Sequence, residues 1–332
     1  KQGNGIVKDY SQFEDKYLET IVSNAGIPRR KIKIAIDCGN AVPGPLTIKL
    51  MEKLNVDLIP VHCDWDNKFP NHPPDPTRPE NMKDLAKAVV ENNAEFGIGM
   101  DGDGDRIGVV DQEGRFIHPD RLMTIFVKDI LAERKGGTES ERTVFYDVKC
   151  SMALEEAIYS SGGIPKMVRT GHSFMKRELK ENPDSPLAGE MSGHFFLNDR
   201  WPGFDDSLYN TARLLEIIAR EPSPNDGGPK FSDWFEDLPK YASTGEAKVP
   251  LTMNRNETMD SVERKFSDMK YSTVDGVRVR YPEGWFLCRP SNTEPILVMR
   301  AEANDEQGLI KIKQDIEERL GGIINLEKFH NS

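Results

Sequence analysis

The chain has 332 residues, of which 30% are charged and 37% hydrophobic, and its formal net charge is −11. This length exceeds one ordinary hydrophobic core, so we expect several domains, and no apolar run is long enough to span a bilayer. The acidic balance argues against nucleic acid or an anionic membrane as a partner, and four scattered cysteines without a C-x-x-C pair are typical of reduced thiols in a cytoplasmic protein.

The first third of the chain is predicted to be an α/β domain preceded by a linker. Residues 1–30 are expected to form a connecting segment with one amphipathic helix. Residues 31–115 alternate short apolar segments with helix-length segments, which indicates βαβ units and a largely parallel sheet. The chain opens without Met or a signal-peptide pattern, so we expect it to begin inside a longer reading frame.

The same alternation restarts, so a second α/β domain is expected at residues 116–235. Within it, Ser173 is predicted to cap a helix that runs to Lys180. Residues 240–332 contain several strands in succession and indicate a smaller α+β domain with a mainly antiparallel sheet. The predicted fold class is therefore α/β, with two consecutive three-layer α/β/α domains followed by this smaller domain.

The most informative stretch is the acidic loop, residues 101–106, with the sequence D-G-D-G-D-R. Asp101, Asp103 and Asp105 alternate with glycines between two apolar segments that are predicted to be strands. Carboxylates this close repel one another, and glycines cost backbone entropy on folding. A bound divalent cation would remove the repulsion, and the glycines would let the loop curl around it. A solvated acidic turn is the alternative.

The ligand set of the acidic loop favours Mg²⁺. The D-x-D-x-D spacing is similar to a calcium EF-hand loop, but that loop requires Gly at its sixth position and Glu at its twelfth, where this chain has Arg106 and Gln112. His and Cys are missing from its sequence neighbourhood, which disfavours zinc. An oxygen-only site beside an arginine suits Mg²⁺ acting on a phosphate. A calcium-binding module stays as a weaker alternative.

Three further segments offer polar groups at predicted strand ends. Lys149, in D-V-K-C, and His172, in T-G-H-S, precede expected helix N-termini, which favour anions. Taken alone, each of these two motifs is better explained by an ordinary helix start. The segment G-E-M-S-G-H contains Glu190, Ser192 and His194: Glu190 can accept from two hydroxyls, and His194 can move a proton near neutral pH. A hairpin turn whose glycines serve only geometry explains this segment equally well.

The last loop, R-P-S-N-T-E-P, resembles a cradle for a phosphate dianion. A guanidinium, two hydroxyls, an amide and turn N–H groups provide suitable donors. The alternative is an Asn-Thr turn with an incidental arginine. The candidate phosphate-binding residues are Arg289, Ser291, Asn292, Thr293 and Arg300.

Taken together and in this order, these motifs resemble the α-D-phosphohexomutase family, and more narrowly its bacterial phosphomannomutase/phosphoglucomutase branch. The motifs are F-P-N-H-x-P-x-P, D-G-D-G-D-R, D-V-K-C, T-G-H-S, G-E-M-S-G-H and R-x-S-N-T. The resemblance covers essentially the whole chain and matches the second, third and fourth of the family's four domains. It implies a magnesium-dependent isomerase of carbohydrate metabolism that exchanges a phosphoryl group between the 1- and 6-hydroxyls of mannose and glucose phosphates.

The resemblance also implies roles for individual residues. The three loop aspartates would hold Mg²⁺ against a phosphoserine, and Arg106 would stabilise the transferring phosphoryl group. Glu190 and Ser192 would bind sugar hydroxyls, and the R-x-S-N-T loop with Arg300 would bind the unreactive phosphate. The remaining candidates are Lys149 and His172, for substrate contact, and His194, for proton transfer.

One departure from the family pattern matters: this chain lacks the T-x-S-H-N-P-like loop that carries the nucleophilic serine. Ser173 is not that residue. We therefore expect the phosphoserine domain of the same protein as a partner, besides hexose phosphates and the bisphosphorylated intermediate, and little activity from this chain alone. A sugar-phosphate-binding module without turnover and a phosphoglucosamine mutase-type enzyme stay as alternatives.

Overall fold

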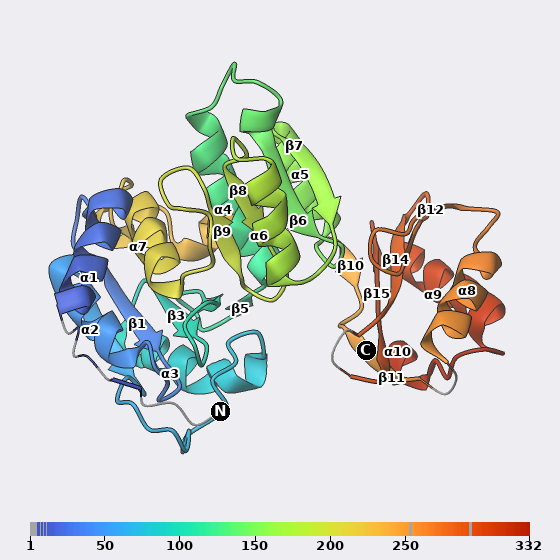
Figure 1. Ribbon diagram of the computed structural model, residues 1–332, viewed down its shortest axis with the longest axis horizontal. Helices are drawn as coiled ribbons and strands as arrows, with labels where there is room; N and C mark the ends of the chain where they lie inside the picture. The colour runs from blue at the N-terminus through green and yellow to red at the C-terminus, as the bar shows by residue number, and fades with distance from the viewer. Residues whose placement is uncertain (1–4, 7, 9, 11, 252–253, 292–293) are drawn as a thin grey trace. The chain divides into compact units, whose positions relative to one another are not determined.

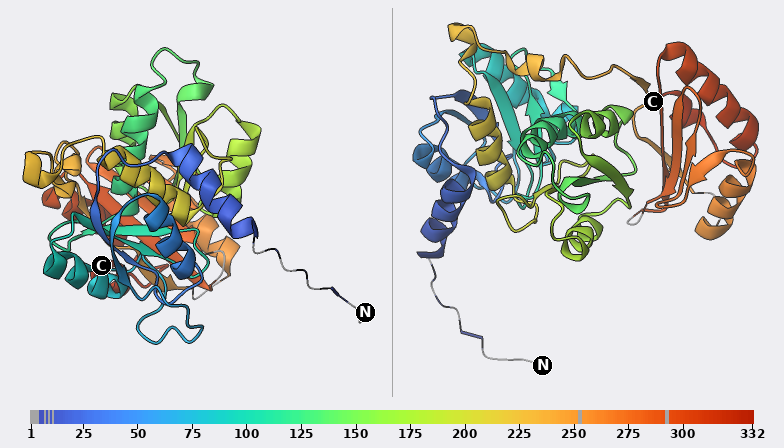
Figure 2. Two further views of the ribbon diagram at one scale, coloured as in Figure 1. Left: turned by 90° about the vertical axis from the view of Figure 1, so that its left-hand side faces the viewer. Right: turned by 90° about the horizontal axis from the view of Figure 1, so that it is seen from above.

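The structure is a computed structural model that describes residues 5–6, 8, 10, 12–251, 254–291 and 294–332. The helices and strands are drawn in Figures 1 and 2. By its internal contacts the chain divides into two compact units, each built from two separate stretches. Unit 1 comprises residues 1–130 and 192–235, and unit 2 comprises residues 131–191 and 236–332. The candidate residues are therefore distributed over two bodies, each described below by itself.

Unit 1 contains a mixed sheet with the strand order β2-β1-β3-β4-β5. Its strands are β1 (Lys33–Asp37), β2 (Asp57–Val61), β3 (Phe96–Met100), β4 (Ile107–Val110) and β5 (Phe116–Ile117). β1 is parallel to β2 and β3, whereas β4 runs antiparallel to β3. Asp37 is in register with Val61 on one side and Gly99 on the other. Because parallel strands end at the same sheet edge, the residues after β1, β2 and β3 lie side by side there.

The helices of unit 1 include those that the alternation in residues 31–115 predicts between the parallel strands. They are η1 (Pro79–Met82), α1 (Gln12–Ala25), α2 (Gly44–Lys53), α3 (Lys83–Asn92), α4 (Pro119–Ala132), α7 (Ser207–Ile218), η3 (Pro224–Asp226) and η4 (Phe231–Phe235), with the short strand β9 (Phe195–Leu197) before α7. Leu85 and Val89 on α3 pack with Ala35 of β1 in one buried cluster. This cluster places α3 against the sheet next to the edge that carries the candidate residues.

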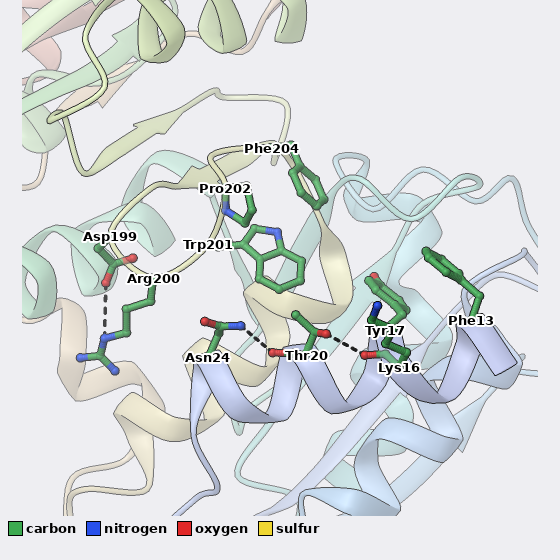
Figure 3. Close-up of a pocket in the computed structure, with 10 residues that line it drawn as sticks. All are labelled: Phe13, Lys16, Tyr17, Thr20, Asn24, Asp199, Arg200, Trp201, Pro202 and Phe204. Atoms are coloured by element: carbon green, nitrogen blue, oxygen red, sulfur yellow. Dashed lines mark hydrogen bonds and ion pairs between the residues drawn. The ribbon is translucent and has the colours of Figure 1, made fainter.

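The contact between α1 and α7 is anchored by one polar pair. Asp206 is the N-cap of α7 and accepts from the Tyr209 backbone N–H, while the Tyr17 hydroxyl of α1 donates to its other oxygen at 2.8 Å. A pocket of about 530 Å³ lies beside this pair, between α1 and the loop before α7. Figure 3 shows Phe13 and Trp201 among the side chains that line it. The segment expected to be a linker helix is thus packed into unit 1.

Unit 2 begins with a parallel sheet in which β6 pairs with both β7 and β8. Its first elements are η2 (Ser140–Arg142), β6 (Thr143–Asp147), α5 (Met152–Ser160), β7 (Ile164–Val168), α6 (His172–Glu181) and β8 (Leu187–Gly189). The helix α6 begins at His172 with Gly171 as its N-cap, and Gly171 has φ 134°. The prediction that Ser173 caps this helix was therefore wrong, because the turn needs a backbone conformation that glycine adopts readily.

The C-terminal part of unit 2 is an antiparallel sheet with helices. The strand order is β10-β15-β14-β13-β12, and β11 also pairs with β15. The elements are β10 (Ala242–Ser243), β11 (Ala247–Pro250), α8 (Arg255–Lys265), β12 (Lys270–Ser272), β13 (Val277–Arg280), β14 (Gly284–Pro290), β15 (Ile296–Ala303), α9 (Glu306–Leu320) and α10 (Glu327–His330). The predicted α/β class with a final antiparallel α+β region is confirmed.

The described residues include no helix whose length and apolarity would let it cross a bilayer. All four cysteines are free and buried.

Candidate functional site

The acidic loop connects β3 to β4, as predicted, and Asp101 organises it. Oδ1 of Asp101 accepts from the backbone N–H groups of Gly104, Asp105 and Arg106 at 3.0–3.1 Å. The side chain is fully buried, and those hydrogen bonds compensate its desolvation. Gly104 has φ 79°, so it supplies the left-handed residue that closes the turn. Gly102 is not among the residues with positive φ.

The three loop aspartates can all reach one cation. Asp101, Asp103 and Asp105 each offer a carboxylate oxygen within 4.8 Å of the others. Burial is the main cause that raises the pKa of Asp105 to about 7. The negative charges of Asp101 and Asp103 also raise this pKa, and the charge of His194 opposes the shift. An all-oxygen set of this charge fits a hard divalent cation, which would neutralise the repulsion that raises this pKa.

Arg106 lies among carboxylates. Its Nε is 2.7 Å from Asp101 Oδ2, and its Nη1 is 3.2 Å from Asp75 Oδ1. Asp75 lies within the F-P-N-H-x-P-x-P motif and was not predicted to take part. The single signal for it was its position in that Pro-rich motif. The guanidinium is thus held in a fixed orientation, with 27% of its side chain exposed.

The segment after Met191 joins the acidic loop in unit 1. Gly193 has φ 86°, its carbonyl accepts from the Ile107 N–H at 3.1 Å, and an added Cβ would lie 2.6 Å from the Ile107 carbonyl oxygen. This close approach places His194 beside the loop, with Nδ1 3.0 Å from Asp205 Oδ2 and 3.6 Å from Asp105 Oδ2. Asp205 was not predicted, and Ser192 precedes Gly193 in the same segment.

In unit 2, Lys149 is buried at the end of β6. Its Nζ is 3.1 Å from Glu246 Oε1 and 3.9 Å from Asp147 Oδ2. Burial lowers the pKa of Lys149, but Glu246, Asp147 and Glu190 more than offset that effect, so the pKa is raised and the ammonium stays charged. Glu190 is 2% exposed and accepts from the Gly171 N–H. Lys149 and Glu190 are thus close enough for their charges to interact.

His172 lies at the start of α6. Its Nδ1 is 3.2 Å from the Lys176 ammonium. Thr170 Oγ1, two residues before His172, donates to Asp147 Oδ2 at 3.1 Å, so the loops that carry His172 and Lys149 are in contact.

The two arginines of the predicted phosphate loop are buried in unit 2. Arg289 Nε donates to Asp275 Oδ2 at 2.7 Å, and Arg300 Nη1 donates to the Lys149 carbonyl at 2.6 Å. Burial raises the pKa of Glu246, but Lys149 and then Arg300 and Arg289 outweigh it and hold that pKa below its usual value. Glu246 thus contacts Lys149 directly and also feels the positive charges of Arg300 and Arg289.

The remaining residues of the phosphate loop are only partly described. The Ser291 backbone N–H donates to the Ile296 carbonyl at 2.9 Å, and the Ser291 hydroxyl accepts from the Glu294 N–H at 3.2 Å. Asn292 and Thr293 lie outside the described residues. Glu246 and Asp275 were not predicted: neither belongs to a motif, and both are recognised only through the cations that they contact.

The fold and these groups define a class: an α/β protein with three loop carboxylates that could hold a cation in one unit and a cluster of buried basic side chains in the other. Sequence models of phosphoglucomutase/phosphomannomutase α/β/α domain II, α/β/α domain III and the C-terminal domain match residues 15–114, 118–241 and 246–319. The chain belongs to the phosphoglucomutase/phosphomannomutase family.

Individual relatives agree with this assignment. The chain is 40% identical to the phosphomannomutase/phosphoglucomutase of Pseudomonas syringae pv. tomato over 94% of its own length and 63% of the relative's. It is 42% identical to the protein of that name from Pseudomonas aeruginosa, over 89% of this chain and 62% of the relative. A crystal structure of a phosphoglucomutase/phosphomannomutase family protein from Burkholderia thailandensis matches with 40% identity and a TM-score of 0.83, over 93% of this chain and 64% of that one. The chain thus spans less than two thirds of the length of these relatives.

Proposed function

We propose that this chain supplies the cation loop and the substrate-binding domains of a phosphohexomutase acting on mannose and glucose phosphates. The whole protein would transfer a phosphoryl group reversibly between the 1- and 6-hydroxyls, through a phosphoserine and a bisphosphorylated sugar. The observation that carries the proposal is the acidic loop, where three carboxylates can reach one cation and Arg106 contacts two of the loop's aspartates. Phosphoryl transfer depends chiefly on positioning and charge neutralisation, and this loop provides both.

Mg²⁺ would be held by Asp101, Asp103 and Asp105. When bound, it would neutralise charge on the transferring phosphoryl group. Asp101 accepts four hydrogen bonds, three on Oδ1 from backbone N–H groups and one on Oδ2 from Arg106. A cation would therefore bind at the lone pair of Oδ2 that Arg106 leaves unused. The loop's backbone N–H groups fix this carboxylate before any ligand arrives, which limits the reorganisation that binding requires.

The cations of unit 2 would bind the phosphate that does not react. Lys149, Arg289 and Arg300 are anchored by backbone or carboxylate partners, so they form a fixed and largely buried cationic cluster. Ser291 with Asn292 and Thr293 would add neutral donors from the adjoining loop. A fixed arrangement of guanidinium groups suits a phosphate dianion better than flexible surface lysines.

The sugar would be oriented by Glu190 and Ser192, which can bind adjacent hydroxyls, with Lys149 and His172 contacting the substrate. His194 would transfer a proton to or from a sugar hydroxyl, because Asp205, 3.0 Å from its Nδ1, stabilises the protonated imidazole. The phosphoserine of this cycle is not assigned to any residue of the chain.

Reconstitution tests the proposal. The chain would be mixed with a separately produced phosphoserine domain of a relative, and conversion of glucose 1-phosphate to glucose 6-phosphate would be followed with a coupled dehydrogenase. We expect Mg²⁺-dependent turnover in the mixture and a loss of at least about 100-fold in the Asp105→Asn variant, since charge stabilisation of this kind contributes several kcal/mol.

Two outcomes would contradict the proposal in different ways. Hexose phosphate binding by calorimetry without any turnover in the mixture would favour a binding module. Tight Ca²⁺ binding with indifference to Mg²⁺ would favour a calcium-dependent role for the acidic loop.

A further inference from the structure

A second cluster of metal-ligating side chains lies at the same sheet edge but uses nitrogen donors. Asp37 is the last residue of β1, His62 follows β2, and His72 lies in the loop that β2 leads into. One ligand atom from each of these three residues lies within 4.8 Å of the others. The cluster has no member in common with the acidic loop or with the cations of unit 2.

In each histidine, one ring nitrogen has a hydrogen-bond partner outside the three-residue cluster, and this partner orients the ring. His72 Nδ1 is 2.9 Å from the Pro73 carbonyl, so it carries the proton, and Nε2 faces Asp37 Oδ2 at 3.0 Å. His62 Nε2 is 2.9 Å from Asp84 Oδ2. Histidines that bind metals usually donate their other ring N–H to a carbonyl or a carboxylate, and both histidines have such a partner.

The backbone of the segment that contains both histidines has two residues in a costly conformation. Among the described residues other than Gly and Asn, the left-handed conformation occurs at His62, with φ 46°, and at Phe69, with φ 47°. Each such residue costs about 1–2 kcal/mol, and strain of this kind gathers at ligand sites. Gly39 allows the loop to approach, because an added Cβ there would lie 2.9 Å from Pro74.

We propose that Asp37, His62 and His72 form a binding site for a zinc-type transition metal ion. Two imidazoles and one carboxylate are a typical donor set for Zn²⁺, Co²⁺ or Ni²⁺, and a poor one for Mg²⁺ or Ca²⁺. Three protein ligands leave a position for water. The Cys63 thiol hydrogen-bonds to Cys38 Sγ at 3.5 Å and is not part of the donor set.

A metal ion at this site would join the loop after β2, which carries both histidines, to the strand that ends at Asp37. That loop also carries Asp75, which contacts Arg106 of the acidic loop. A metal ion at this position would therefore stabilise unit 1 and restrict the segment that orients Arg106. The occupied site serves as a structural cross-link next to the acidic loop rather than as a second reaction centre.

Zinc titration of the metal-stripped full chain tests this inference. Calorimetry with ZnCl₂ and the visible spectrum of the Co²⁺-loaded chain would be compared for wild type, His62→Ala and His72→Ala. We expect one Zn²⁺ per chain, at least about tenfold weaker binding in each variant, and loss of the Co²⁺ absorption bands, because each variant removes a ligand. Zn²⁺ should raise Tm in wild type but not in His62→Ala or His72→Ala.

Two control variants distinguish this site from other metal-binding groups. His330→Ala removes an exposed histidine that pairs with Glu317, and Asp103→Asn removes an acidic-loop ligand; both should leave Zn²⁺ affinity unchanged. If His72→Ala fails to fold, His62→Asn decides, since it keeps the Asp37–His72 contact. The inference is overturned if wild type binds no Zn²⁺, if the histidine variants bind it equally well, or if Asp103→Asn abolishes binding.

Discussion

Glu246 Oε1 lies 3.1 Å from Lys149 Nζ, so a carboxylate of the chain itself neutralises the cations proposed to bind phosphate. Arg289 and Arg300 also lower the pKa of this carboxyl group. A phosphate dianion at Lys149 would place two anions next to each other unless Glu246 moved away. Its side chain is 33% exposed, so it has room to turn toward solvent.

The first prediction follows from that competition. Glu246→Gln removes the negative charge but keeps the shape, so we expect glucose 6-phosphate to bind about three- to tenfold more tightly, equivalent to about 0.7–1.4 kcal/mol. Titration calorimetry with glucose 6-phosphate measures this affinity in both proteins. Glu14→Gln, which removes a surface partner of Lys49 in unit 1, is the matched control and should not change the affinity. Equal or weaker binding by Glu246→Gln would show that Glu246 assists the phosphate.

The second prediction concerns stability and pH. Because the pKa of Glu246 in the folded chain lies below its ordinary value of 4.5, its ionised form stabilises the fold. This contribution is present above pH 4.5 and is lost as the pH falls through the lower folded pKa. The free energy of unfolding of wild type should therefore fall more steeply than that of Glu246→Gln as the pH decreases below 4.5. Denaturant titrations at several pH values measure both slopes, and parallel curves would refute the assignment.

The third prediction separates structure from metal binding in the acidic loop. Asp101→Asn replaces a buried carboxylate that accepts from three N–H groups and from Arg106, so we expect a loss of about 2–3 kcal/mol in the free energy of unfolding without metal. Asp103→Asn, on the exposed part of the loop, should cost less than about 0.5 kcal/mol. Both variants should weaken Mg²⁺ binding. Urea denaturation in EDTA distinguishes them, and equal losses would contradict the organising role of Asp101.

The fourth prediction tests the close approach that brings His194 to the acidic loop. Gly193 and Gly227 have nearly the same φ, 86° and 85°. A Cβ added at Gly193 would lie 2.6 Å from the Ile107 carbonyl oxygen, whereas one added at Gly227 would have no other residue within 4 Å. Gly227→Ala should therefore cost about 1 kcal/mol through backbone strain alone. Gly193→Ala should cost about 1–3 kcal/mol more, because the backbone must shift. Thermal unfolding compares them, and equal costs would show that the loop moves freely.

Local patterns predicted the elements that carry the candidate residues. The apolar segments on both sides of the acidic loop form β3 and β4 as expected, because uninterrupted buried strands are visible in sequence. The two-residue strands β5 and β10 were not predicted, since they form only when a partner strand is present. The cap of α6 was assigned to Ser173 because serine is a good cap in isolation, but the chain turns at Gly171.

The candidate catalytic and binding motifs could be selected from the sequence itself, because each motif is contiguous and its proposed chemistry depends on residue type and spacing. The partners of those motifs were decided by the tertiary structure. Arg300 contacts the Lys149 carbonyl across 151 residues, and His72 contacts Asp37 across 35. Such contacts depend on which strands are neighbours and in what register, and a single sequence contains no local signal for either. Glu246 beside Lys149, and the two histidines beside Asp37, therefore became visible only when the strand ends were brought together.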